Sequence, residues 1–374
     1  MRVLICGGGV IGAATAYFLA CRGVEAIVIE RAGLGCAASG KAGGFLARDW
    51  CDGTPLAPLA QRSFVLHAEL AQQRLGDWGY RRLDTYGGLA DGRRHVRLHD
   101  PHYELGWLSP RVRVERRLGS PETTAQVHPA AFTAALMRAA EARGGRLHAG
   151  RVTGIVRRLG SERVTGVAVD GATIEGDVVV IAMGPWSLLA AAWLPLPAVF
   201  GLKGHSLVFD TGAEMAADAV FLEYREMGGT MQQPEVFPRP DGTTYVCAIS
   251  SERPLPLDPA AVMPDPGAIE RLEAICAGLS PALTPARIRA RQACYRPITA
   301  DGLPLIGRVP GVAGAYVATG HSVWGILNAP ATGEAMAELI TEGAARQVDL
   351  APFDPGRMRP LDPARLRQAP ARPL

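Results

Sequence analysis

The sequence predicts an α/β fold, in which a Rossmann-like dinucleotide-binding domain carries α+β insertions that form a substrate domain on an antiparallel sheet. Two observations lead to this prediction. The first thirty residues run as strand, glycine motif, helix, strand and acid, which is the order of a βαβ nucleotide site. Three strand-like runs at 150–175 then form a β-meander that feeds a continuous apolar strand at 177–182.

The glycine motif, Gly7–Gly12 (GGGVIG), matches the pattern G-x-G-x-x-G. Gly7 allows a tight turn, Gly9 lets the backbone approach a pyrophosphate, and Gly12 lets the helix pack closely on the strand. Glu30 follows 18 residues after the last glycine and can accept hydrogen bonds from a ribose. An ordinary glycine-rich turn would not explain the flanking strands and the acid. The motif therefore predicts a nucleotide site, but it does not separate FAD from NAD.

A loop of small residues follows at Arg31–Leu46 (RAGLGCAASGKAGGFL). Such a segment suits close approach of the backbone to a flat ligand, with Ser39 and backbone amides donating to phosphate. Composition alone also fits a flexible surface loop. The position directly after the nucleotide motif favours the ligand-binding interpretation.

Periodicity and turn residues predict the remaining elements. We expect helices at 56–75, 129–143, 267–279 and 329–342. We expect further strands at 199–210, 220–224, 243–249 and 316–320, and irregular structure at 77–129. The expected dinucleotide-binding domain comprises residues 1–45, 130–190 and 291–350. The expected substrate domain comprises 46–129 and 191–290, and residues 351–374 form a C-terminal tail.

The composition limits the class of protein. With 374 residues, 48% of them hydrophobic, 20% charged, and a net charge of +3, the chain has the makeup of an ordinary globular protein. No basic stripe with interleaved aromatic residues points to nucleic acid. Seven cysteines without a C-x-x-C or metal-ligand spacing argue against a metal site, and their odd number suggests reduced thiols in a cytoplasmic compartment. No apolar run reaches the roughly 18 residues of a membrane span. The oligomeric state stays open.

Five segments, in this order, resemble the D-amino-acid oxidase/glycine oxidase superfamily of flavoproteins. They are Gly7–Gly12 with Glu30, 38–44 (ASGKAGG), 182–187 (AMGPWS), 296–307 (RPITADGLPLIG) and 320–333 (GHSVWGILNAPATG). The last two are the most specific, because the family pairs R-P-x-T-x-D-G-x-P with a terminal G-H-x-x-x-G-I-x-x-A-P-x-x-G. The chain as a whole is similar to a poorly characterised branch of oxidoreductases in this family. The resemblance implies a glutathione-reductase-type fold and FAD as the cofactor.

The resemblance also implies where FAD lies. The backbone of Val152 meets the adenine, Gly184 and Trp186 lie near the diphosphate, and residues 320–327 cradle the flavin ring. A helix N-terminus at 328–330 would direct positive potential at the flavin N1/C2=O edge. The full expected FAD-binding set is Gly7, Gly9, Val10, Ile11, Gly12, Glu30, Arg31, Ala38, Ser39, Lys41, Ala42, Gly43, Gly44, Val152, Ala182, Gly184, Trp186, Cys294, Gly320, His321, Gly325, Ile326 and Leu327.

Cys294 has a special position in this set. It lies seven residues before Asp301, the spacing at which sarcosine oxidase-like enzymes carry the cysteine that bonds to FAD. Free cysteine is also a common small buried hydrophobe. Covalent attachment and a simple buried thiol are both open.

On the substrate side, Arg296 corresponds to the family arginine that holds a substrate carboxylate, a group that the guanidinium fork matches in geometry. The alternative is a structural ion pair with Asp301. His321, Glu235 and Tyr245 complete the expected catalytic set. Further candidates for lining the substrate side, or else for packing, are Trp50, Tyr224 and Trp324.

The resemblance implies an FAD-dependent oxidoreductase that oxidises the C–N bond of an amine or amino acid by hydride transfer to flavin N5, giving an imine. Its partners would be a small-molecule amine and molecular oxygen or another electron acceptor. The strand 243–249 lacks the oxygen-activating lysine of sarcosine oxidases, and the only lysines are Lys41 and Lys203, which argues against fast oxidase activity. Two alternatives stay open: dehydrogenation of a larger amine-bearing biosynthetic intermediate, and a flavin-carrying interaction protein with little turnover.

Overall fold

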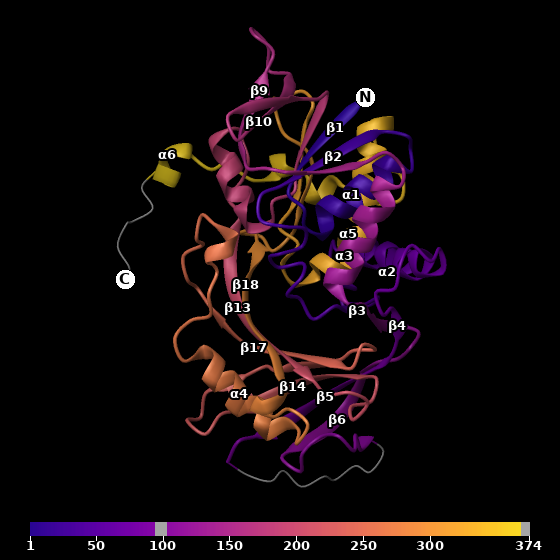
Figure 1. Cartoon of the computed structure of the whole chain (residues 1–374), viewed down its shortest axis with the longest axis vertical. Coiled ribbons are helices and arrows are strands. Elements are labelled where there is room, and N and C mark those ends of the chain that lie inside the picture. The colour runs from indigo at the N-terminus through magenta and orange to yellow at the C-terminus, as the bar shows by residue number, and fades with distance from the viewer. Residues whose placement is uncertain (94–102, 368–374) are drawn as a thin grey trace.

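The computed structural model describes residues 1–93 and 103–367. The chain is organised around two large sheets, one in the upper half of Figure 1 and one in the lower half. The mixed α/β architecture agrees with the expected fold class. The expected domain boundaries stay a prediction.

A six-stranded sheet forms the centre of the upper half. Its order is β19–β20–β12–β1–β2–β8, and all neighbours are parallel except β19, which is antiparallel to β20. The strands are β1 (Arg2–Cys6), β2 (Glu25–Glu30), β8 (Arg146–Ala149), β12 (Val178–Ile181), β19 (Leu305–Arg308) and β20 (Ala315–Thr319). The central strands are near-continuous apolar runs, as expected for parallel strands that are buried on both faces.

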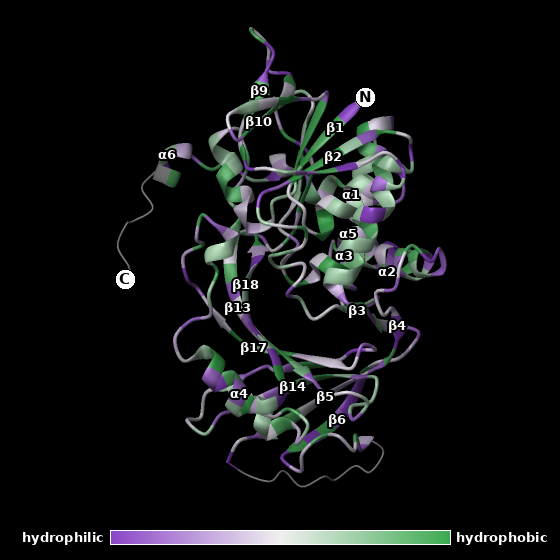
Figure 2. Ribbon diagram, viewed as in Figure 1, coloured by the Kyte–Doolittle hydropathy of each residue, from purple (hydrophilic) through white to green (hydrophobic). Residues whose placement is uncertain are grey.

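Helices cover one face of this sheet and the β-meander covers the other. Val3 and Ile5 of β1 face the helices, while Leu4 and Cys6 face the meander, because successive side chains of a strand point to opposite faces. Figure 2 shows hydrophobic residues along β1 and hydrophilic residues on β6 at the far end of the molecule. The covering elements are α1 (Val10–Ala20), α2 (Ala57–Gln72), α3 (Pro129–Glu141) and α5 (Gly325–Glu342) on one side, and β9 (Val152–Arg157), β10 (Val164–Val169) and β11 (Ala172–Glu175) on the other.

Helix α5 begins four residues before the expected start and contains Pro330 in its interior. Proline has no N–H, so the carbonyl of Ile326 loses its helical donor. The imidazole Nε2 of His67 on α2 donates to that carbonyl at 3.0 Å, and the hydroxyl of Ser63 accepts from the N–H of Ala331 at 3.1 Å. Side chains of α2 therefore satisfy the groups that the proline leaves unpaired, and the helix continues through it.

The lower sheet has eight strands in the order β18–β13–β17–β16–β14–β5–β6, with β15 paired to β14. All neighbours are antiparallel except β14 and β5. Helix α4 (Ala268–Leu279) packs on one face, and the other face turns toward the upper half (Figure 1). The strands are β5 (Asp84–Asp91), β6 (Val112–Gly119), β13 (Phe200–Asp210), β14 (Asp218–Arg225), β15 (Met231–Gln232), β16 (Glu235–Pro238), β17 (Thr243–Ser251) and β18 (Ile288–Ile298).

The prediction of irregular structure at 77–129 is wrong for much of this segment. β5 and β6 form one edge of the lower sheet, although β5 contains two glycines and few strand-forming residues. A Cβ at Gly88 would lie 2.2 Å from the carbonyl oxygen of Arg113, so the close pairing of β5 with β6 requires glycine there. A small third sheet joins β3 (Phe45–Ala47), β4 (Arg81–Arg82) and β7 (Thr124–Gln126).

Part of the expected C-terminal tail packs on the upper half. Phe353 is fully buried, and Arg357 forms an ion pair with Asp301 at 2.7 Å. Residues 368–374 of that tail lie outside the described residues. Within the described ranges, no helix has both the length and the apolar character needed to cross a membrane.

Candidate active site

One cavity of about 430 Å³ lies where the carboxyl ends of β1, β12 and β20 meet the open face of the lower sheet. This is the edge of a parallel sheet at which nucleotides bind. The expected site residues that line it are Gly7, Gly9, Val10, Ile11, Glu30, Arg31, Ala38, Ser39, Lys41, Ala42, Gly43, Val152, Ala182, Gly184, Trp186, Glu235, Tyr245, Cys294, Arg296, Gly320, His321, Gly325 and Ile326.

The glycine motif is packed too tightly for side chains at two of its positions. Gly7 has a φ of 113°, and a Cβ there would lie 2.4 Å from the carbonyl oxygen of Ala182. A Cβ at Gly12 would lie 2.0 Å from the carbonyl oxygen of Gly7. Gly12 therefore supports the turn from behind, and it is not among the residues that line the cavity. At Gly9 a Cβ would approach only the hydroxyl of Ser39, at 3.2 Å, and this glycine does line the cavity.

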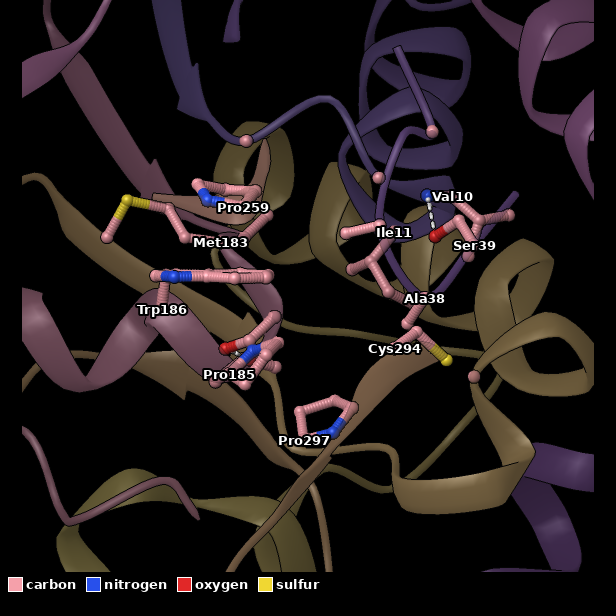
Figure 3. A pocket seen from close by; sticks show the side chains of 18 of the residues that line it. Val10, Ile11, Ala38, Ser39, Met183, Pro185, Trp186, Pro259, Cys294 and Pro297 are labelled. Atoms are coloured by element: carbon pink, nitrogen blue, oxygen red, sulfur yellow. Dashed lines mark hydrogen bonds between the residues drawn. The ribbon is translucent and has the colours of Figure 1, made fainter. Parts of the chain in front are cut away.

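Polar side chains hold the nucleotide motif in place. The carboxylate of Glu30 accepts from the N–H of Gly8 at 2.7 Å and from the N–H of Ala32 at 2.8 Å. The hydroxyl oxygen of Ser39 accepts from the N–H of Val10 at 2.9 Å, as Figure 3 shows. Ser39 thus caps the first turn of α1, and its own O–H stays available to donate into the cavity.

The segment 256–259, here called the strap, borders the cavity and was not predicted from the sequence. Leu257 and Pro259 line it, although they belong to a proline-rich connection with no motif. The indole Nε1 of Trp186 donates to the carbonyl of Pro256 at 2.8 Å, and the guanidinium of Arg31 donates to the carbonyl of Leu257 at 3.0 Å. In Figure 3 the flat indole lies below Met183 and Pro259. The strap therefore joins two predicted FAD-binding residues across the cavity.

The lower sheet contributes side chains from the strands β16, β17 and β18; β13 lies between β18 and β17. Tyr245 and Cys247 of β17, and Cys294 and Arg296 of β18, are each two residues apart, so each pair shares one face of its strand. Glu235 of β16 lies directly opposite Cys247 in the register. Cys247 was missed, although its spacing from the predicted Tyr245 is a signal that could have found it.

Arg296 does not form the alternative ion pair that the sequence left open. Asp301 pairs with Arg357 instead. Arg296 makes one hydrogen bond, to the hydroxyl of Ser250 at 3.2 Å, and forms no ion pair with any described residue. A Cβ at Gly204 would come within 3.3 Å of its terminal nitrogen, so this glycine makes room for the guanidinium.

Burial dominates the titration of the groups on this face. It raises the pKa of the Glu235 carboxyl, against the opposing charge of Arg296 and the thiol of Cys247, whose Sγ lies 3.5 Å from a Glu235 oxygen. It also raises the pKa of the Cys247 thiol and of the Tyr245 hydroxyl. The thiol and the phenol are therefore neutral at ordinary pH.

His321 is a neutral, hydrogen-bonded residue at the edge of the cavity. Burial lowers the pKa of its imidazole to about 3. Its Nε2 lies 3.0 Å from the hydroxyl of Thr332 on α5. This arrangement fixes the ring against the helix whose N-terminus faces the cavity.

The two lysines have different surroundings. Lys41 lines the cavity, and its ammonium donates to the carbonyl of Ala293 at 3.1 Å. Lys203 forms an ion pair with Asp265 at 2.6 Å and is not among the lining residues. Burial raises the pKa of the Cys294 thiol, against the charges of Arg296 and Lys41.

Other expected residues lie away from the cavity lining. Gly44 and Leu327 are not among the lining residues. Tyr224 is buried in the hydrophobic cluster beneath α4, so of its two alternatives, lining the substrate side or packing, the structure shows packing. Trp50 and Trp324 are half-buried and contact each other at a centroid distance of 6.3 Å. Within the described ranges, no group of three His, Cys, Asp or Glu side chains could hold a metal ion.

The cavity fits FAD. Its volume falls within the roughly 300–1,000 Å³ of small-molecule sites. Gly9, Val10 and Ile11 line it at the first turn of α1, where backbone N–H groups have no intrahelical acceptor and attract phosphate. The acid Glu30 stands where a ribose would bind, and Trp186 supplies a flat apolar wall.

Comparisons with known proteins cover nearly the whole chain. Residues 2–339 match the DAO family, described as FAD dependent oxidoreductase. A Schizosaccharomyces pombe protein, named only as an oxidoreductase, is 33% identical over 95% of this chain and 97% of its own length. The glycine oxidase of Pseudomonas aeruginosa is 30% identical over 96% of this chain and 99% of its own. The crystal structure of glycine oxidase from Geobacillus kaustophilus superposes with a TM-score of 0.79 and 26% identity, over 96% of this chain and 99% of that one.

Proposed function

Because the chain belongs to the DAO family of FAD-dependent oxidoreductases, we propose that it oxidises the C–N bond of an amino acid to an imine. When bound, FAD supplies the hydride acceptor at flavin N5. The protein's own residues hold the substrate at the lower-sheet side of the cavity and exclude water from it.

Arg296 is the observation that supports an amino acid over a simple amine. Arg296 lines the cavity, its guanidinium makes a single hydrogen bond to a neutral hydroxyl, and it has no acidic partner among the described residues. A guanidinium presents a rigid fork of donors that binds a carboxylate through two parallel hydrogen bonds. A carboxylate bound there would neutralise the charge and leave the amine-bearing carbon free to face the cofactor.

The remaining polar groups act mainly by positioning the substrate and the cofactor, and less by transferring protons. His321 is neutral and tied to Thr332, so it offers no charge at ordinary pH. The N-terminal end of α5 faces the cavity through Gly325 and Ile326, and its positive potential favours negative charge there. Catalysis by such a site depends mainly on orientation of the reacting C–H bond.

Anaerobic mixing tests the proposal. The FAD-loaded protein is combined with α-amino acids and, separately, with the corresponding amines that lack the carboxylate, and the absorbance of oxidised flavin near ~450 nm is followed. Amino acids should bleach the band and the decarboxylated amines should not. The Arg296→Met variant should lose the bleaching, and Arg289→Met, which removes an exposed arginine from the same strand, should keep it.

Two results would count against this function. Equal bleaching by amino acids and by their amines would remove the role of the carboxylate. A wild-type flavin that no amino acid or amine reduces would favour a flavin-carrying interaction protein with little turnover.

A second candidate keeps the chemistry and enlarges the substrate. Tyr245 in the cavity wall stacks on Phe237 at 6.1 Å, and Phe237 stacks on Phe45 at 5.5 Å. Trp50 and Phe221 extend this cluster, and both are half-buried. An aromatic wall of this kind favours a substrate with a bulky apolar group. A higher kcat/KM for aromatic amino acids than for alanine would support it, and the reverse order would reject it.

A further inference from the structure

Glu235 and Arg296 are two half-buried side chains of opposite charge that line one cavity. They come from different strands, β16 and β18, which are separated in the sheet by β17 and β13. Within the described part of the chain they form no ion pair with each other or with any other residue. Both residues line the space where a substrate would lie.

The protein satisfies these two groups only with neutral partners. The Glu235 carboxylate has the thiol of Cys247, with Sγ at 3.5 Å, and the Arg296 guanidinium has the hydroxyl of Ser250 at 3.2 Å. A charge that is removed from water costs several kcal/mol unless an opposite charge and hydrogen bonds compensate for it. Neither group has a charged protein partner, so each is free to pair with an opposite charge of a ligand that displaces water from the cavity.

The direction of the Glu235 titration agrees with this picture. Burial raises the pKa of its carboxyl, because the charge of Arg296 and the thiol of Cys247 only partly oppose it. A cation placed beside the carboxylate would bring the pKa down again and would gain a favourable electrostatic interaction. The ammonium of Lys41, which also lines the cavity, donates to the carbonyl of Ala293.

A ligand with both charges would complete both groups at once. Resting on the proposed function, we propose that Glu235 recognises the substrate through its ammonium group, while Arg296 holds the carboxylate of the same molecule. Glu235 is thus a specificity-determining residue. It selects zwitterionic amino acids over carboxylates of the same shape that carry no positive charge. In turnover the bound ammonium would give one proton to the Glu235 carboxylate, which leaves a neutral amine on the carbon that then loses hydride.

Two isosteric probes test the assignment without turnover. α-Aminoisobutyrate and pivalate have the same shape and both carry a carboxylate, but an ammonium group in the first replaces a methyl group in the second. Neither has a hydrogen on the carbon next to the carboxylate, so neither can be oxidised there. Their dissociation constants for the FAD-loaded protein are measured from the perturbation of the flavin absorbance.

The wild-type protein should bind α-aminoisobutyrate about 10-fold or more tightly than pivalate, as expected for one hydrogen bond between charged groups. Glu235→Gln should remove this preference and leave the affinity for pivalate within about 3-fold, because the isosteric amide lacks only the charge. Arg296→Met should weaken both probes. Glu223→Gln, an exposed acid on β14, is the matched control for net charge and should behave as wild type.

Two results would overturn the role of Glu235. One is equal binding of the two probes by the wild type, and the other is a preference for α-aminoisobutyrate that persists in Glu235→Gln. If Glu235→Gln does not fold or lacks FAD, Glu235→Asp takes its place: it keeps the charge but retracts it by one methylene, and it should weaken α-aminoisobutyrate alone.

The test also separates this inference from the proposed function. Bleaching of the flavin by amino acids, together with no preference between the probes, would keep the function and reject the role of Glu235. A preference that Glu235→Gln abolishes, in a protein whose flavin no amino acid reduces, would reject the function and keep the recognition site.

Discussion

The two ends of the cavity are built in different ways. The nucleotide end is centred on backbone and small residues of the N-terminal stretch, Gly7–Ile11 and the loop that contains Ser39 and Gly43, with Ala182, Gly184 and Trp186 beside them. The sheet end consists of large polar side chains such as Glu235 and Arg296, which come from strands far apart in sequence. At the nucleotide end, glycines leave room for the ligand because they have no side chain. At the sheet end, polar side chains extend toward the ligand.

The difference implies that the two ends respond differently to substitution. A side chain added at the nucleotide end collides with backbone, which cannot move without disturbing the fold. A side chain removed at the sheet end takes away a ligand contact and leaves the strand pairing intact. Cofactor binding and substrate binding should therefore be separable by mutation.

The largest expected effect is at the nucleotide end. In Gly12→Val the Cβ would lie 2.0 Å from the carbonyl oxygen of Gly7, so we expect loss of bound FAD and a fall of at least about 3 kcal/mol in the free energy of unfolding. Denaturant unfolding and the ratio of flavin to protein absorbance measure both. Gly23→Ala is the control: its φ of 71° strains the backbone by about 1 kcal/mol, but nothing lies within 4 Å and FAD should stay bound. Retention of FAD by Gly12→Val would contradict the tight packing.

A large effect confined to catalysis is expected at the sheet end. Arg296→Met should lower kcat/KM for an amino acid by about 100-fold, since a charge-assisted bidentate contact contributes roughly 3 kcal/mol. The dissociation constant of FAD should stay the same. Steady-state kinetics and an FAD titration check the two halves of this prediction. Weakened FAD binding in this variant would show that the two ends are not separable.

A smaller effect is expected from Glu30→Gln. The carboxylate holds the N–H groups of Gly8 and Ala32, and the amide can accept on one side only. FAD should bind about 10-fold more weakly, in line with the loss of one hydrogen bond to a charged group. Glu25→Gln, on the same strand and paired with Arg2, is the control and should not change FAD affinity. An unchanged affinity in Glu30→Gln would remove Glu30 from the cofactor site.

The smallest effect is expected at Cys294. Burial raises the pKa of its thiol, and the thiolate is the form that attacks a flavin, so we expect FAD to be held without a covalent bond. Acid precipitation of the wild type and of Cys294→Ser should release the yellow colour from both. Colour that remains in the wild-type pellet and leaves in the variant would establish the covalent bond instead.

The same contrast explains which features could be predicted from the sequence. The glycine motif and Glu30 depend on local backbone geometry, which short spacings determine, and the structure places the acid and both outer glycines as expected. The strands β13, β14, β17 and β20 carry a regular apolar pattern and were also predicted, whereas β16 and β18, which carry Glu235 and Arg296, were not. β5 was missed because its pairing depends on β6 and β14, and no local pattern encodes a partner that far along the chain.

Contacts from other elements account for the remaining differences. The early start of α5 depends on His67 and Ser63 of α2, which hydrogen-bond to the groups around Pro330. No sequence pattern near residue 325 indicates these contacts. The strap at Leu257 is held by Trp186 and Arg31 from two distant segments. Single-sequence reasoning locates the residues of such contacts but not their partners.

A crystal structure of the FAD-loaded protein with α-aminoisobutyrate bound would show whether cofactor and substrate occupy opposite ends of the cavity. We expect the FAD diphosphate at the first turn of α1 beside Gly9, the probe's carboxylate on Arg296, and its ammonium group beside Glu235. A carboxylate bound away from Arg296, or a diphosphate away from the glycine motif, would contradict the division of the cavity into a backbone-built cofactor end and a side-chain-built substrate end.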